Sequence, residues 1–95
     1  MRYYVIKELN NNLYLGTVGV VRKLHEAMFY DDLDLALECS EKEHVLNGFL
    51  FRALGEAYGI DIWHLDISQE MYDREKGKLN IRVIPVEIHE GTYYE

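Results

Sequence analysis

Residues that favour strands dominate the start of the chain, where successive side chains would alternate between the two faces of a strand. Residues 2–9 and 13–21 are rich in Tyr, Val, Ile and Leu, and a run of three asparagines separates them. Asparagine tolerates the left-handed backbone that a tight hairpin needs, so the pattern predicts two antiparallel strands joined by a turn. Residues 24–30 alternate in the same way and predict a third strand.

The spacing of the apolar residues then changes from that of a strand to that of a helix. An Asp-Asp pair precedes residues 33–39, which predicts a short helix with an acidic first turn. The run Ser40-Glu41-Lys42-Glu43 has the form of a capping box. Behind it, apolar residues recur at helical spacing until Gly59, which suits a helix end. The pattern predicts a long helix over 41–58.

Strand-like alternation returns after the long helix, over residues 60–67 and 79–89. The apolar phase slips in both segments, and Pro85 in the second indicates an edge position or a bulge. Residues 68–76 are polar and fit either a helical turn or a loop. Residues 91–95 are predicted to be a frayed tail.

The order β-β-(β)-α-α-β-β predicts one α+β domain over residues 1–95. In this domain a mostly antiparallel sheet of four to five strands is covered by one long helix and a short one. The apolar arc of the helix at 41–58 spans about 240°, more than one sheet covers. Either the rest of the chain covers the surplus, or a homodimer forms through this apolar face or through a sheet edge.

The other side of the same helix carries two glycines. His44, Gly48 and Gly55 fall within about 40° of one another on the helix surface. Each glycine inside a helix costs about 1 kcal/mol relative to alanine. The pattern predicts either that another group approaches the backbone there or that the cost is simply tolerated.

Acidic residues are concentrated in the middle of the chain. Thirteen of the seventeen lie between Glu26 and Glu75, a stretch with three lysines and arginines, and the net charge is −7. This charge disfavours direct binding to nucleic acid. No apolar run reaches the ~20 residues that span a bilayer, so no membrane is expected. A single cysteine suits a reducing compartment and predicts a cytoplasmic protein.

Motifs of catalysis and of cofactor binding are absent from the sequence, so no cofactor and no catalytic residue are predicted. Cys39 lies at the end of a predicted helix, where the helix dipole disfavours a thiolate. The weak candidates for a metal site are His64 and Asp66, on one face of a predicted strand, with Asp61 nearby. A small metal-binding enzyme or sensor is therefore one alternative.

Carboxylates around the two predicted helix starts are the candidates for a binding surface. An array of folded carboxylates can imitate a phosphate backbone and engage a basic site on a protein. Tyrosine is enriched at the centres of interfaces, so two tyrosines are candidate anchors. The alternative is a solvated acidic face that keeps the protein in solution. The partner-binding candidates are Asp31, Asp32, Asp34, Glu38, Glu41, Glu43, Tyr30 and Tyr72.

The first forty residues resemble small uncharacterised proteins encoded by bacterial phages and mobile elements. The resemblance is carried by Tyr-Tyr-Val-Ile-Lys-Glu, then Asn-Leu-Tyr-Leu-Gly, then Ala-Met-Phe, then an Asp-Leu-Ala segment that leads into a helix. It implies a setting in which short acidic proteins inhibit host machinery, as anti-CRISPR and anti-restriction proteins do. The leading interpretation is a non-enzymatic module that binds a basic site on a nucleic-acid-binding host protein, in the host cytoplasm if phage-encoded.

Overall fold

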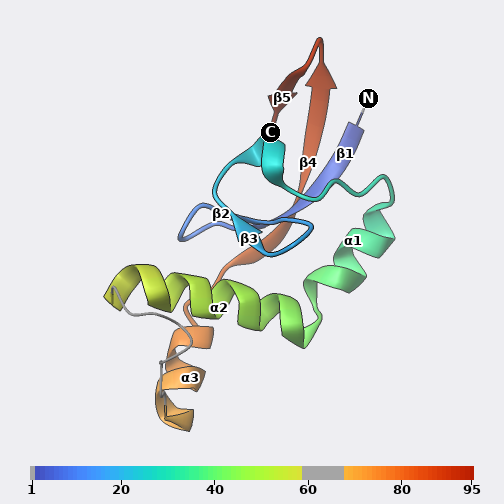
Figure 1. Ribbon diagram of the computed structural model, residues 1–95. Coiled ribbons are helices and arrows are strands. Elements are labelled where there is room, and N and C mark those ends of the chain that lie inside the picture. Colours follow the sequence, from blue (N-terminus) through green and yellow to red (C-terminus); the bar gives the residue numbers. More distant parts are fainter. Residues whose placement is uncertain (1, 59–67) are drawn as a thin grey trace.

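The computed structural model describes residues 2–58 and 68–95, and its fold is α+β (Figure 1). One antiparallel sheet has the strand order β3-β2-β1-β4-β5. The strands are β1 (Arg2–Glu8), β2 (Leu13–Leu15), β3 (Val20–Val21), β4 (Ile81–His89) and β5 (Thr92–Tyr94). The helices are η1 (Leu24–Glu26), α1 (Leu33–Ser40), α2 (Glu43–Tyr58) and α3 (Gln69–Lys76). The predicted fold class is confirmed, and the strand expected at 60–67 lies outside the described residues.

The asparagine run forms the turn of the predicted β1–β2 hairpin. Asn12 has a φ of 54°, the left-handed conformation that this residue type tolerates. The carboxylate of Glu8 is fully buried and accepts hydrogen bonds from three groups in this turn. It also accepts a hydrogen bond from the backbone N–H of Asn80, at 2.7 Å. Glu8 therefore ties the hairpin turn to the start of β4.

The strand predicted at 13–21 is two strands in the structure. A tight turn with a hydrogen bond from the Gly16 N–H to the Gly19 carbonyl (2.7 Å) folds β3 back onto β2. The strand predicted at 24–30 was also wrong. That segment holds the 3-10 helix η1 and then joins the sheet only through isolated bridges, Gly16 to Ala27 and Tyr4 to Tyr30. Alternating polarity here reflects an extended segment lying on the sheet.

The capping box predicted at Ser40 does not form. The Ser40 hydroxyl donates to the carbonyl of Leu37 at 2.7 Å and so belongs to the end of α1. Helix α2 begins at Glu43, two residues later than predicted. The predicted N-cap of α1 does form. The Asp32 carboxylate accepts hydrogen bonds from the backbone N–H groups of Asp34 and Leu35.

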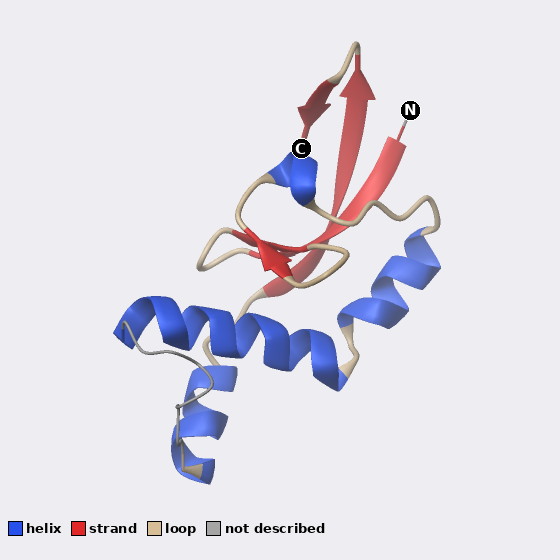
Figure 2. Ribbon diagram, in the orientation of Figure 1, coloured by secondary structure: helices blue, strands red, loops and turns tan. Residues whose placement is uncertain are grey.

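Helix α3 covers part of the surplus apolar surface of α2. It is capped by Ser68, whose hydroxyl accepts from the N–H of Met71, and it ends at Gly77. It runs away from the sheet at the lower end of the molecule (Figure 2) and packs against α2. On α2, Leu50 and Leu54 are both buried. The chain itself therefore covers apolar positions that a homodimer through α2 would need.

Strand β4 accommodates Pro85 because no strand within residues 2–58 and 68–95 pairs with its outer side there. β5 pairs with β4 only from Glu87 to His89, beyond the proline. On the inner side, Pro85 lies opposite Tyr4, whose backbone N–H and carbonyl are both bonded to Tyr30 instead. The missing N–H of the proline therefore leaves no hydrogen bond unmade, in agreement with the edge position that the sequence indicated.

The end of the chain is a strand, so the frayed tail predicted for 91–95 was wrong. A turn with Gly91 at φ 79° brings β5 back along β4. The Glu95 carboxylate then accepts hydrogen bonds from Lys7 Nζ (3.1 Å) and from the Tyr14 hydroxyl (2.7 Å). Lys7 Nζ also lies 5.0 Å from the centre of the Tyr14 ring. These contacts hold residues 91–95 against the sheet, although their polarity alone suggested a frayed tail.

This cluster makes the fold sensitive to alkaline pH. Burial, and then the hydrogen bond to Glu95, raises the pKa of Tyr14 above its ordinary value of 10.0. Burial alone would lower the pKa of Lys7, but Glu95 and Tyr14 outweigh it and raise that pKa above 10.5. Both groups hold their protons longer in the folded chain than in the unfolded one. Their contribution to stability is therefore complete below about pH 10 and is lost as pH rises through the folded pKa values.

We expect the substitution Tyr14→Phe to flatten this alkaline loss of stability, since phenylalanine has no proton to lose. The measurement is the free energy of unfolding in urea at a series of pH values from about 8 to about 11. Some slope will remain, because burial and then the Cys39 thiol raise the pKa of Tyr30 as well. A variant whose stability falls as steeply as that of the wild type would contradict the role given to Tyr14.

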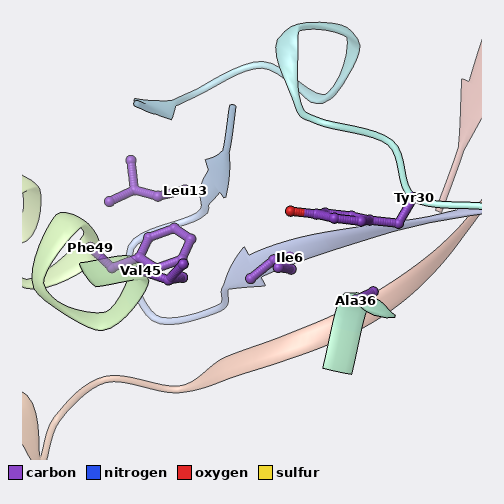
Figure 3. Packing of buried hydrophobic residues seen from close by; sticks show 6 residues of the cluster. All are labelled: Ile6, Leu13, Tyr30, Ala36, Val45 and Phe49. Atoms are coloured by element: carbon purple, nitrogen blue, oxygen red, sulfur yellow. The ribbon is translucent and has the colours of Figure 1, made fainter. Parts of the chain in front are cut away.

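Two hydrophobic clusters lie on opposite faces of the sheet. Figure 3 shows the larger one, where Phe49 and Val45 of α2 pack beside Leu13, and Ala36 of α1 lies beyond Ile6 of β1. The cluster on the other face lies under the segment that contains η1, and its buried members are Val5, Tyr14, Ala27 and Val86. Helices cover one face and an irregular segment covers the other, so β1 is buried on both sides.

Two glycines illustrate opposite constraints. A Cβ at Gly48 in α2 would meet only Val20 Cγ2, at 3.6 Å, whereas a Cβ at Gly16 would lie 2.7 Å from the Gly19 carbonyl oxygen. We expect Gly48→Ala to stabilise the protein by about 1 kcal/mol and Gly16→Ala to destabilise it. For a domain of this size, the first change corresponds to a rise in Tm of about 4–8 °C. Thermal unfolding of both variants checks the pair, and a lower Tm for Gly48→Ala would contradict the ordinary van der Waals contact expected between its Cβ and Val20.

Candidate functional site

Helix α1 has a single buried residue, so most of its side chains, both acidic and apolar, lie at the surface. Ala36 packs into the core and fixes which side of the helix faces the sheet. At 100° per residue, Asp34, Glu38 and Glu41 fall within about 60° of one another, on the side opposite Ala36. All three side chains are exposed. We call these three residues the acidic face of α1.

Exposed leucines border the acidic face on both sides. By the same helix geometry, Leu37 and then Leu33 lie on one flank, and Leu35 lies on the other. Their exposed fractions are 42% for Leu33, 46% for Leu35 and 45% for Leu37. Three half-exposed leucines on an eight-residue helix give this surface apolar area beside its charge. The spacing Leu-x-Leu-x-Leu already carried the signal, since residues two apart cannot share one helix face.

The carboxylates around α1 have no cationic partner within salt-bridge distance anywhere in residues 2–58 and 68–95. Some acidic residues elsewhere do have such partners, whereas Glu70, Asp73 and Glu90 have none among the described residues. Glu56 pairs with Arg22 and Arg52, and Glu75 pairs with Arg74 and Lys78. The negative charge of α1 is therefore left to solvent or to a partner, while much of the remaining charge is compensated within the fold.

The other predicted acidic residues lie near this face but differ in role. Asp31 precedes the helix and is exposed. Asp32 uses its carboxylate to cap α1. Glu43 is exposed in the first turn of α2, across the short connection from α1. The structure thus brings the predicted carboxylates to one helix and its two ends.

The two tyrosines predicted as interface anchors instead support the fold. Tyr30 is buried in the core, where burial and then the nearby Cys39 side chain raise the pKa of its hydroxyl. Tyr72 is half-buried on α3 and donates to Asn47 Oδ1 of α2 at 2.6 Å. Lys76 Nζ also lies 5.7 Å from the centre of the Tyr72 ring. Tyr30 is buried and the Tyr72 hydroxyl is hydrogen-bonded within the chain, so the structure does not present either tyrosine as an exposed anchor.

The candidate metal ligands belong to the segment between α2 and α3. His64, Asp66 and Asp61 lie outside the described residues. Among residues 2–58 and 68–95, no group of three or more His, Cys, Asp or Glu side chains could hold a metal ion. The described part of the chain therefore offers no geometry that supports the metal-binding alternative.

Comparison with known proteins gives no family for this chain. No family model, curated protein or solved structure matches it. None of the helices within residues 2–58 and 68–95 has the length and apolar content needed to cross a bilayer. What the chain can do has to be argued from its own surface.

Proposed function

We propose that the protein is a non-enzymatic interaction module that binds a protein partner with a basic surface through the acidic face of α1. The observation that carries this proposal is the set of three exposed carboxylates, Asp34, Glu38 and Glu41, without a cationic partner in the described part of the chain. Uncompensated charge on one helix face is complementary to a basic patch, and complementarity of this kind raises association rates and selects partners.

The flanking leucines add apolar surface, which contributes more to the free energy of binding than exposed charges do. Exposed ion pairs contribute little to affinity, typically about 0–1 kcal/mol each. Burying apolar side chains contributes about 25 cal/mol for each Å² removed from water. Leu35 and Leu37 lie on either side of the carboxylates, so a partner that covers the acidic face also covers apolar surface. A helix recognised along one face through residues three and four apart is a common mode of protein binding.

The spacing of the carboxylates fits a site that otherwise holds nucleic acid. Residues 34 to 41 span about 10 Å along the helix axis, which places three charges at intervals of about 5 Å. One DNA strand carries a phosphate about every 3.4 Å. The acidic face is thus a short and somewhat sparser imitation of a single strand. This supports an inhibitor of the anti-CRISPR or anti-restriction class, acting in the cytoplasm on a nucleic-acid-binding protein of the host.

The test compares two variants with equal charge changes. The first neutralises the acidic face by Asp34→Asn, Glu38→Gln and Glu41→Gln, and leaves the Asp32 cap intact. The second is the control, with Glu70→Gln, Asp73→Asn and Glu90→Gln, which are exposed residues on α3 and beyond β4. Each protein is immobilised and exposed to a bacterial lysate at about 50 mM and about 300 mM salt, because charge interactions over about 10 Å are screened in this range.

We expect wild type and control to retain the same proteins at low salt and to release them at high salt. The variant of the acidic face will retain none of them. Capture that is equal for all three proteins would contradict the proposal. Light scattering on the same samples shows whether the leucines instead join two copies of the chain, in which case the wild type would have twice the monomer mass and the proposal would fail.

A further inference from the structure

A groove of about 650 Å³ lies between the turn that joins β2 to β3 and one side of α2. It is separate from the acidic face of α1. Its walls are mostly apolar and come from three segments of the chain, residues 15–20, 28–30 and 39–52. The apolar side chains that line it include Leu15, Val20, Met28, Tyr30, Val45 and Phe51.

The charged residues that line the groove are all basic. Lys42, His44 and Arg52 contribute to it, and no aspartate or glutamate of the described residues does. The whole stretch from Glu26 to Glu75 holds three lysines and arginines, and two of them are at this groove. Within the described residues, the side chains of Lys42 and His44 have no ion pair or hydrogen bond. Arg52 Nε is paired with Glu56 Oε1 at 2.9 Å, so the positive charge at the groove that no acidic residue of the described chain offsets is that of Lys42.

The groove owes part of its depth to Gly48. His44, Gly48 and Arg52 are four residues apart in succession and therefore lie along one side of α2. At Gly48 no side chain fills the space between the basic residues, and the nearest atom to a Cβ there would be Val20 Cγ2, at 3.6 Å. An alanine would fit at this position, so the cost of glycine in a helix is not forced by a close backbone contact. The open space serves the groove.

We propose that this groove binds a small organic anion with an apolar body and one acidic head group, such as an alkyl carboxylate. The apolar walls would cover the body, Lys42 and His44 would hold the head group, and Arg52, which is paired with Glu56, would add positive charge further along α2. Binding sites for small molecules commonly enclose about 300–1,000 Å³ with apolar walls and a few polar groups, and this groove falls within that range. The proposal rests on other residues than the proposed function does, so each can fail without the other.

Octanoate is the probe, and octanol, which has the same apolar chain without the charge, is its control. Binding is measured by the shifts of backbone amide signals in an NMR titration of the wild-type protein. We expect octanoate to shift the signals of groove residues such as Gly48 and Val20. Octanol will bind about tenfold more weakly, since it lacks the charge-assisted contacts. Equal affinity for the two probes, or shifts that avoid the groove, would overturn the proposal.

Variants separate the charge of the groove from its shape. Lys42→Gln with Arg52→Gln removes two charges at exposed positions and should weaken octanoate, but not octanol, about tenfold. Arg74→Gln with Lys78→Gln removes the same charge on and after α3 and should leave the affinity unchanged. Gly48→Leu fills the groove and should weaken both probes. If Gly48→Leu does not fold, the smaller Gly48→Ala gives the same direction of change, and unchanged affinity in the charge variant would itself contradict the proposal.

The single cysteine offers an independent readout. Cys39 is half-buried and lines the groove beside Tyr30. Octanoate in the groove should therefore slow the alkylation of Cys39 by iodoacetamide, a neutral reagent, in proportion to the occupancy measured by NMR. Alkylation at the same rate with and without saturating octanoate would place the bound anion elsewhere and overturn the assignment.

Discussion

Replacing Glu8 with alanine will lower the free energy of unfolding by about 3 kcal/mol, a large share of the 5–15 kcal/mol that holds a typical domain together. Glu8 is fully buried, and its carboxylate accepts four hydrogen bonds. One of these, from the backbone N–H of Asn80, joins positions 72 apart in sequence. Alanine leaves all four donors without this acceptor. Unfolding in urea, followed by circular dichroism, measures the change.

The variant Glu8→Gln separates shape from charge at the same site. Glutamine keeps the volume but places an amide N–H₂ where one carboxylate oxygen accepts two hydrogen bonds, so about half of the arrangement is lost. We expect a loss between that of wild type and that of Glu8→Ala. Stability equal to wild type in Glu8→Ala would mean that water replaces the carboxylate at no cost, which contradicts the role assigned to it.

Replacing Phe49 with alanine will destabilise the protein by about 3–5 kcal/mol, because the removed ring leaves a cavity in the core. Phe49 is 0% exposed and packs with Val45 and Leu13 where α2 meets the sheet (Figure 3). For a domain of this size, such a loss lowers Tm by well over 10 °C, at about 4–8 °C for each kcal/mol. Thermal and urea unfolding both measure it.

Phe51 provides the matched control for Phe49. It lies two residues further along α2, is half-buried and lines the groove instead of the core. Phe51→Ala removes the same ring from a site that water already reaches, so its cost should be well below that of Phe49→Ala. Equal losses for the two variants would show that the described core is not what anchors α2 to the sheet.

The parts of the fold that the sequence predicts well are those governed by local patterns. The Asn-rich turn, the long amphipathic helix and the antiparallel character of the sheet follow from backbone preference and apolar spacing. Some of the predictions that failed, such as the frayed tail, depend on contacts between distant residues. Glu95, for example, is held by Lys7 and Tyr14 from the other end of the chain, and no local pattern reports this.

The same division applies to the candidate site. The positions of Asp34, Glu38 and Glu41 on one face follow from helix geometry, and the sequence indicated them. These carboxylates lack cationic partners, whereas Glu56 has two. This difference depends on how the helices and loops pack together, which the spacing of residues in the sequence does not encode. Tyr30 was misassigned for a similar reason, because the bridge to Tyr4 that buries it joins distant segments.

The sequence predicted only one side of the groove. The sequence placed His44 and Gly48 on one side of the long helix and left open whether anything approaches there. In the structure Val20 lies opposite Gly48, and the two glycines that bracket the β2–β3 turn bring it there. Periodicity within one helix thus identified one wall of the groove, while the other wall required the fold.

The most direct test of the central claim is the salt dependence of affinity for whichever partner the wild-type protein captures. The dissociation constant is measured by calorimetry at several salt concentrations, for the wild type and for the variant with Asp34→Asn, Glu38→Gln and Glu41→Gln. If the acidic face of α1 makes the contact, wild-type affinity falls steeply with salt, and the variant binds weakly with little salt dependence. Equal affinity and equal salt dependence for the two proteins would contradict the account.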